Sequence, residues 1–118
     1  MPQVYAERAT IPVPGGKVIE ELVGAASTKS SDISIAHMTA PAGWTEPFQT
    51  PEFEEYTVVL RGTVTVECNG VVLECHAGQT LVTRPGERIR YGVGPDGAEY
   101  IAICIPAFSP ETVHREDE

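Results

Sequence analysis

The sequence has few of the features that mark secreted or membrane-bound proteins. It contains 3 cysteines, an odd number without tight spacing, which argues against a disulfide framework or a zinc knot. Residues 1–10 lack the apolar core of a signal peptide, and no apolar run approaches the length needed to cross a membrane. We therefore expect a soluble protein in the reducing cytoplasm.

Basic residues are also scarce. The chain has 8 Lys and Arg against 17 Asp and Glu, which gives a formal net charge of -9. This charge repels phosphate backbones and anionic lipids. The densest basic cluster, Arg84, Arg88 and Arg90, is interrupted by Glu87 and has no aromatic stacking series beside it. We therefore expect neither nucleic-acid nor membrane binding.

The composition is that of one packed domain rich in turns. The 118 residues are 42% hydrophobic and 21% charged, which excludes a disordered chain and allows a sizeable core. The 11 Gly and 10 Pro predict frequent turns and short elements. This combination favours an all-β architecture.

The apolar pattern predicts about nine short strands and no long helix. Asn69-Gly70 lies between two alternating runs and is the strongest hairpin signal in the chain. Ser109-Pro110-Glu111 is typical of a helix start. Evenly spaced short antiparallel strands indicate a closed barrel or a double-sheet jelly roll. The expected strands cover residues 3–9, 17–24, 32–39, 56–60, 63–68, 71–75, 79–83, 87–93 and 99–105, and 17–24 would also fit one helical turn.

Three regions follow from this pattern. We expect an N-terminal arm with edge strands over residues 1–31, a barrel over 32–108 and a C-terminal tail with a short helical turn over 109–118. The arm has little core of its own, and its edge strand would pair with a second subunit as easily as with its own chain. We therefore expect a homodimer.

Two side chains are candidate functional groups because of where they stand in apolar strands. Glu55 opens an apolar strand, and a carboxylate there costs free energy unless something pairs with it. His37 alternates with Ile33 and Ile35, so all three are expected on one face. His37 is then either a structural histidine bonded to a neighbour or a ligand or proton carrier in a cavity.

The spacing around Glu55 resembles the first motif of the cupins. That motif has a Gly, five residues, a His-x-His pair, three or four residues, a Glu, six residues and a Gly. Gly43, Glu55 and Gly62 fall at the matching places, whereas Gln49 and Pro51 occupy the two His positions.

A second stretch is similar to the second cupin motif, which has a Gly, five residues, Pro-x-Gly, two residues and a His. Gly78 and Gly86 match it, while Arg84 replaces the Pro and Ile89 replaces the His. The resemblance covers roughly residues 32–106 and implies the cupin double-stranded β-helix, a jelly-roll barrel. A looser similarity is to small cupins of the ethanolamine-utilisation type, which also lose the metal histidines.

The resemblance also implies a site inside the barrel. A family-standard cupin site holds Mn, Fe, Ni or Zn with three histidines and a glutamate, and of these four ligands only Glu55 is present here. We therefore expect the barrel to bind a small polar ligand, without a standard three-histidine metal site. The residues expected to bind the ligand around Glu55 are Trp44, Glu46, Phe48, Phe53, Arg84 and Tyr91.

Two alternatives stay open. In the first, the aromatic side chains only plug the barrel or pack a dimer interface, and Arg84 only neutralises Glu55. In the second, the protein is an enzyme. A metal-dependent oxygenase or isomerase would hold a divalent Ni, Zn, Fe or Mn through Gln49, Glu55 and His37. A metal-free catalyst would use Glu55 to transfer a proton opposite Tyr91 or His37.

Overall fold

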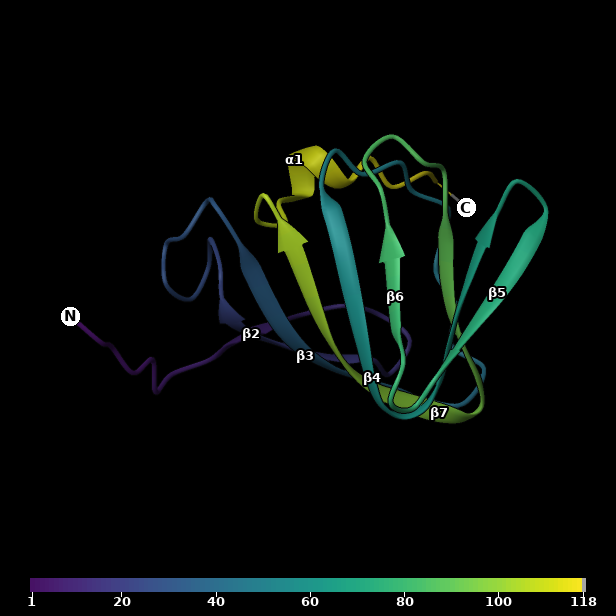
Figure 1. The fold of residues 1–118 in the computed structure, drawn as a ribbon, viewed down its shortest axis with the longest axis horizontal. Helices are drawn as coiled ribbons and strands as arrows, with labels where there is room; N and C mark the ends of the chain where they lie inside the picture. The colour runs from purple at the N-terminus through teal and green to yellow at the C-terminus, as the bar shows by residue number, and fades with distance from the viewer. Residues whose placement is uncertain (118) are drawn as a thin grey trace.

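The structure is a computed structural model that describes residues 1–117, which form a barrel of antiparallel strands with one helical turn (Figure 1). The strands pair in the order β1-β2-β3-β7-β4-β5, and β6 also pairs with β4. The predicted all-β jelly-roll architecture is thereby confirmed. The elements are β1 (Ala9–Ile11), β2 (Val18–Val23), β3 (Ser34–Ala40), β4 (Glu54–Cys68), β5 (Val71–His76), β6 (Thr80–Thr83), β7 (Arg90–Ile105) and α1 (Pro110–Val113).

Two of the strands are longer than the sequence pattern predicts. β4 joins the expected strands 56–60 and 63–68, and β7 joins much of 87–93 with 99–105. The pairing register between them shifts on both sides of Gly62, so the expected turn there is a bulge within a continuous strand. Such bulges bend a strand, which lets β4 and β7 curl around the end of the barrel (Figure 1).

The Asn69-Gly70 hairpin is present as predicted. Cys68 pairs with Val71, and both turn residues have positive φ, 53° at Asn69 and 77° at Gly70. Positive φ at both central residues is the requirement of a type I′ turn. This turn fixes the register of β4 against β5.

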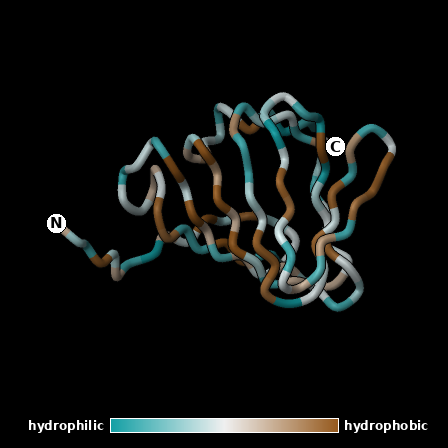
Figure 2. The backbone as a smooth tube through the Cα atoms, viewed as in Figure 1, coloured by the Kyte–Doolittle hydropathy of each residue, from teal (hydrophilic) through white to brown (hydrophobic). Residues whose placement is uncertain are grey.

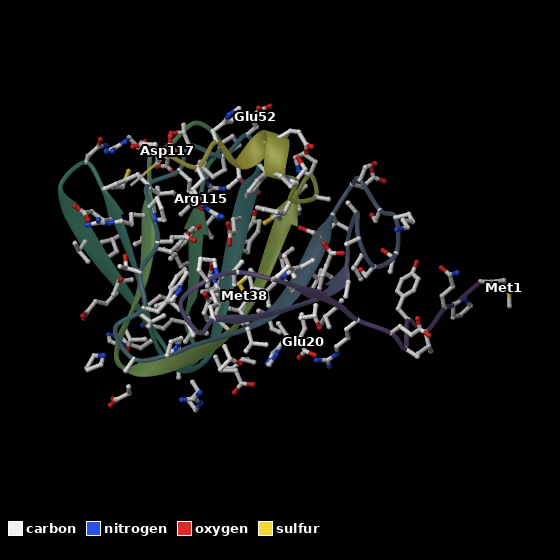
Figure 3. All side chains as sticks on the ribbon, turned by 180° about the vertical axis from the view of Figure 1, so that it is seen from behind. Met1, Glu20, Met38, Glu52, Arg115 and Asp117 are labelled. Carbon is white, nitrogen blue, oxygen red and sulfur yellow. The ribbon has the colours of Figure 1, made fainter. Side chains whose placement is uncertain are left out.

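The N-terminal strand differs from the prediction. It covers Ala9–Ile11 rather than residues 3–9, and it pairs with β2. The preceding residues lead away from the barrel, with Met1 at the far end (Figure 3). Residues 18–23 are a strand, which decides between the two readings of that segment. The connection of residues 12–17 between β1 and β2 is here called the strap.

Apolar residues lie along the strands and polar residues along the connecting loops (Figure 2). Two clusters of buried side chains result, one around Val59, Val64 and Ile89, and a smaller one of Phe53, Cys104 and Val113. Burial of these side chains is the main stabilising contribution to the barrel. Among the described residues, no helix is long and apolar enough to cross a membrane.

We predict that the β4 bulge depends on the missing side chain of Gly62. At φ 77° a Cβ added there would lie 2.0 Å from the carbonyl oxygen of Gly97. Gly62→Ala should therefore lower the free energy of unfolding in urea by more than Gly70→Ala. Gly70 has the same φ but open space around it, so its substitution should cost only about 1–2 kcal/mol. Equal losses in the two variants would show that the close approach at Gly62 is unimportant.

Candidate functional site

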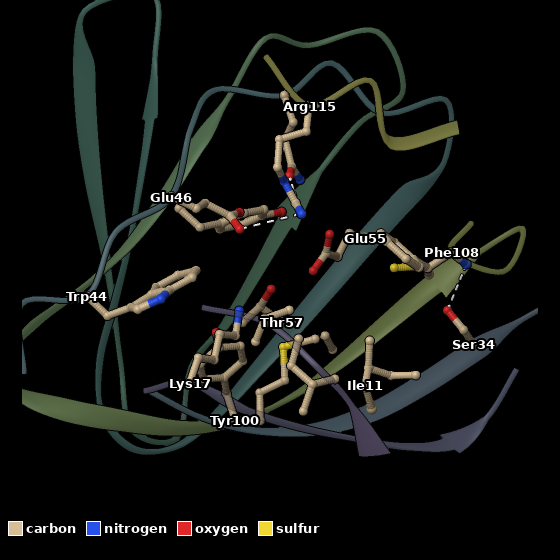
Figure 4. A pocket seen from close by; sticks show the side chains of 18 of the residues that line it. Ile11, Lys17, Ser34, Trp44, Glu46, Glu55, Thr57, Tyr100, Phe108 and Arg115 are labelled. Carbon is tan, nitrogen blue, oxygen red and sulfur yellow. Dashed lines mark hydrogen bonds and ion pairs between the residues drawn. The ribbon is translucent and has the colours of Figure 1, made fainter. Parts of the chain in front are cut away.

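A cavity of about 460 Å³ lies inside the barrel, within the usual range for small-molecule sites. Its walls are the strap, the inward faces of β2, β3, β4 and β7, the loop between β3 and β4, and the C-terminal tail. Figure 4 shows the charged side chains gathered on one side and the apolar side chains Ile11 and Phe108 on the other. The polar lining residues are Lys17, Glu21, Ser34, Thr45, Glu46, Gln49, Glu55, Thr57, Tyr91, Tyr100 and Arg115.

Glu55 is the second residue of β4 and points into this cavity (Figure 4). Successive side chains on a strand alternate between faces, so Glu55 and Thr57 point inward while Glu54 points outward. β4 is hydrogen-bonded on both sides here, with Cys104 of β7 and Thr83 of β6 opposite Glu55. The backbone that carries the carboxylate is therefore held in place.

The environment of Glu55 favours its protonated form. Burial, with a contribution from Glu46, raises the pKa of Glu55 from 4.5 to about 7. Lys17, a hydrogen bond from Tyr91 and Arg115 act in the opposite direction. The carboxyl group therefore exchanges its proton near neutral pH.

Tyr91 remains a neutral hydroxyl beside this carboxyl group. Its oxygen lies 2.8 Å from Oγ1 of Thr83, and the ring is 7% exposed. Burial and the nearby Glu55 raise the pKa of Tyr91 well above 10. The hydroxyl is thus available as a hydrogen-bond donor at any physiological pH.

Glu46 and Arg115 form a pair at the edge of the cavity. Nη2 of Arg115 lies 3.5 Å from Oε2 of Glu46 and donates to Oε1 of Gln49 at 3.2 Å. Burial raises the pKa of Glu46, whereas Lys17 and Arg115 lower it. The tail thus brings a guanidinium to the carboxylate of the loop.

Lys17 extends from the strap into the cavity. Its Nζ lies 4.0 Å from the ring centroid of Trp44 and 5.5 Å from that of Tyr100. Burial lowers the pKa of Lys17, although Glu46 and Glu55 counteract it. Within residues 1–117 Nζ has no carboxylate within 4.0 Å. A desolvated cation–π contact is worth about 2 kcal/mol, less than the several kcal/mol it costs to bury an ion.

Thr57 adds an unused hydrogen-bonding group. Its side chain is 1% exposed and lines the cavity two residues after Glu55. Its Oγ1 has no hydrogen-bond partner in the described part of the chain. Buried hydroxyls are normally paired, so this atom suits a polar group that enters the cavity.

The donor set does not fit a cupin metal centre. Ile89 and Pro51 stand at two of the histidine positions of the family motif, and both are buried apolar residues. Residues 1–117 contain no group of three His, Cys, Asp or Glu side chains that could hold an ion. The lining places Lys17 and Arg115 beside the carboxylates of Glu21, Glu46 and Glu55, so organic cations already stand where a metal ion would offset these acids.

The structure brings together most of the residues expected at the site. The predicted residues that line the cavity are Trp44, Glu46, Gln49, Phe53, Glu55 and Tyr91. They come from the β3–β4 loop, the start of β4 and the first residues of β7. The glycine spacing of the two motifs was sufficient to place these segments at one end of the barrel.

Two of the residues expected to bind the ligand, Phe48 and Arg84, do not line the cavity, so these two predictions are wrong. Phe48 packs outside the cavity. Its ring centroid lies 3.9 Å from Cζ of Arg88 and 4.7 Å from Cζ of Arg90. Arg84 is exposed and pairs with Glu54 at 2.5 Å rather than with Glu55. The reason is the strand alternation that turns Glu54 and Glu55 to opposite faces.

His37 is also misplaced by the sequence pattern. The inward face of β3 carries Ser34, Ala36 and Met38, while His37 lies on the outer face. Its Nε2 is 2.7 Å from Oε2 of Glu99. Ile35 lies on the same outer face as His37. The apolar residues beside His37 in the sequence therefore belong to the outer surface and not to the cavity wall. His37 therefore cannot serve as a ligand to a group bound beside Glu55.

Sequence reasoning missed the two cavity cations, Lys17 and Arg115. A signal for Lys17 existed, because Lys17, Ile19 and Glu21 alternate along one face and all three line the cavity. Arg115 offered no such signal. Its position depends on contacts that tie the tail to the β3–β4 loop, such as the hydrogen bond from Glu116 N to the carbonyl of Phe48.

This chain is similar to a curated protein in sequence and to solved structures in fold. No protein-family model matches the chain. It is 44% identical over 107 residues to the endoribonuclease YbeY of Myxococcus xanthus, an alignment that covers 90% of this chain and 36% of that protein. The chain thus spans about a third of the length of this relative.

Among solved structures, an RmlC-like cupin from Shewanella frigidimarina superposes with a TM-score of 0.74 at 15% identity and covers 93% of this chain and 94% of its own. The EutQ protein of Clostridium difficile superposes with a TM-score of 0.60 at 20% identity, covering 80% and 72%. Likeness at these identities establishes architecture and nothing about activity. The chain therefore has the fold of the cupins.

Proposed function

We propose that this cupin binds a small organic molecule in its interior, without a family-standard metal, and that Glu55 supplies the exchangeable proton of the site. The observation that carries the proposal is a carboxyl group with a pKa of about 7 that points into a cavity of about 460 Å³. The other charged groups that line the cavity are Lys17, Arg115, Glu21 and Glu46, and its lining within residues 1–117 contains no imidazole. Such a cavity orients a ligand through a few directed polar contacts and apolar walls.

The same arrangement supports proton transfer as a second function. A general acid or base works best when its pKa lies near the operating pH, which is the case for Glu55. Tyr91 is a neutral donor on the same side of the cavity. A metal-free isomerase that moves a proton between two positions of one substrate would need these two groups and no redox cofactor.

The endoribonuclease name of the Myxococcus relative gives no further function for this chain. That name belongs to a protein of which this chain spans 36%. With a net charge of -9, this chain repels RNA phosphates. Lys17 lines the interior of the barrel rather than an exposed basic surface.

We predict that ligand binding survives removal of metal and depends on Glu55. In a thermal-shift screen of small polar molecules against protein dialysed with EDTA, at least one compound should raise Tm. Its affinity should fall about tenfold in Glu55→Gln, because the ligand loses the hydrogen bond that the carboxyl proton donates. The control is Glu54→Gln, next along β4 but paired outside with Arg84.

Two outcomes would contradict this prediction. One is a large fall in Tm on EDTA treatment that Ni, Zn, Fe or Mn restores, because a structural or catalytic ion would then belong to the site. The other is equal loss of affinity in Glu55→Gln and Glu54→Gln, because the ligand would then bind outside the cavity.

The stability of the protein should also report the pKa of Glu55. Since the native state binds this proton more tightly than the unfolded state, the stabilisation is present at low pH and is lost as pH rises from about 4.5 to about 7. The loss is at most about 3 kcal/mol. Urea unfolding of Glu55→Gln should lack this decrease, so that the two curves diverge over this pH range. Parallel curves would show that Glu55 titrates normally.

We also propose a homodimer that covers the outer face of the sheet. Cross-strand neighbours on that face include Ile35 with Ile103 and Val58 with Ile101, all only partly buried in one chain. Leu60 and Ile105 extend the apolar surface with exposures of 50% and 46%. An apolar face of this kind, with an exposed N-terminal arm beside it, suits a second copy in an isologous contact.

Sedimentation should therefore give the mass of a dimer at micromolar concentration. Ile103→Glu should shift the mass to that of a monomer, because a charge would be buried in the interface. Val72→Glu is the control, since Val72 is 57% exposed on β5, away from this face. A monomeric unmodified protein would rule out the dimer.

A further inference from the structure

The charge of Lys17 is the feature of the cavity that the proposed function leaves unexplained. Arg115 already offsets Glu46 at 3.5 Å. In the described chain, Nζ of Lys17 has no carboxylate within 4.0 Å and lies over the rings of Trp44 and Tyr100. A desolvated ammonium is costly unless an anion approaches it. Glu46 and Glu55 attract this charge through space, but neither forms a direct ion pair with it.

The groups near Lys17 also limit what can bind. A cationic ligand would meet the charge of Lys17, while two of the cavity carboxylates already have partners, Glu46 in Arg115 and Glu21 in backbone N–H groups. A neutral ligand would leave the ammonium without a direct ion pair. An anionic group would offset it and could also accept a hydrogen bond from Thr57, whose buried Oγ1 has no partner. Thr57 is the independent observation, because an unpaired hydroxyl on the cavity wall points to a missing polar group.

The opposite half of the cavity is mainly apolar, and its hydroxyl, Ser34 Oγ, already accepts a hydrogen bond from the backbone N–H of Phe108. Figure 4 places Ile11 and Phe108 across the cavity from Lys17 and Trp44. Ile19 and Phe53 line it as well. A molecule that fills both halves has a charged end and an apolar body.

From this arrangement we infer that the ligand is a small organic monocarboxylate, with its carboxylate held by Nζ of Lys17 and Oγ1 of Thr57 and its apolar body toward Ile11 and Phe108. This inference rests on the proposed function and names its ligand class. One carboxylate matches one ammonium that lacks a direct ion pair. The other cavity cation, Arg115, is already engaged by Glu46, so a dicarboxylate would have no second cation left for its second charge.

Binding of this ligand should be coupled to protonation of Glu55. A bound carboxylate is a further negative charge near Glu55, so it favours the neutral acid there. Affinity should therefore decrease as pH rises through about 7, the pKa of Glu55. The other titratable or charged groups around Glu55 are Lys17, Glu46, Tyr91, Tyr100, Cys104 and Arg115.

The test uses matched pairs of probes and titration calorimetry on the full chain. The probes are linear carboxylates from butanoate to decanoate and phenylacetate, each with its amide and its amine. At least one carboxylate should bind at least tenfold more tightly than its amide, and the amines should bind weakest. The affinity of that carboxylate should fall several-fold between pH 6 and pH 8 in the unmodified protein and stay constant in Glu55→Gln.

Four variants test whether Lys17 and Thr57 cause the preference for carboxylates over amides. Lys17→Met should weaken carboxylate binding by tenfold or more and change amide binding less than threefold, while Lys17→Arg should largely restore it. Thr57→Val keeps the side-chain shape and should cost several-fold. Lys29→Met is the matched control, because Lys29 is the exposed second lysine of the chain. Circular dichroism checks that each variant is folded.

The outcomes separate this inference from the proposed function. If amides or amines bind as tightly as carboxylates, or if Lys17→Met and Lys29→Met behave alike, the ligand class is wrong although the cavity binds. If carboxylates fail while other compounds of the thermal-shift screen bind in a Glu55-dependent way, the inference falls and the proposed function stands. If no compound binds, both fail.

Discussion

The burial of ionisable groups in the barrel is the constraint on which the site depends. Glu55 stands on a strand that is hydrogen-bonded on both sides, so its carboxyl group cannot turn away from the cavity without breaking the sheet. The interior must therefore accommodate this acid, either by neutralising its charge or by supplying cations. The structure does both, because burial moves the pKa of Glu55 to about 7 while Lys17 and Arg115 stand nearby.

These two cations come from outside the part of the chain that carries the cupin motifs. Lys17 belongs to the strap, and Arg115 belongs to the C-terminal tail. In the family-standard site a metal ion would offset the glutamate. Here the compensation depends on how the two ends of the domain fold over the barrel. The strap and the tail are therefore part of the site.

The sequence predicted the architecture better than the direction of individual side chains. Glycine spacing and the Asn69-Gly70 hairpin led to the jelly roll, because turn geometry is encoded by adjacent residues. The prediction that His37 could face a cavity was wrong. The outer face of β3 is also apolar, and alternation alone does not say which face is inside. Arg115 could not be predicted, since nothing local in a charged tail indicates where its side chain binds.

The residue at one histidine position of the cupin motif, Ile89, explains why the site lacks an imidazole there. Ile89 is 1% exposed and belongs to the main core cluster, and its backbone exchanges two hydrogen bonds of 2.8 Å with Gln49. The position thus contributes to packing and holds the β3–β4 loop that carries Glu46 and Trp44. A side chain so placed leaves no space for an imidazole without loss of core packing. The cavity has accordingly kept the acid of the cupin motif and surrounds it with an ammonium, a guanidinium, a hydroxyl and an amide, which are groups that recognise organic molecules.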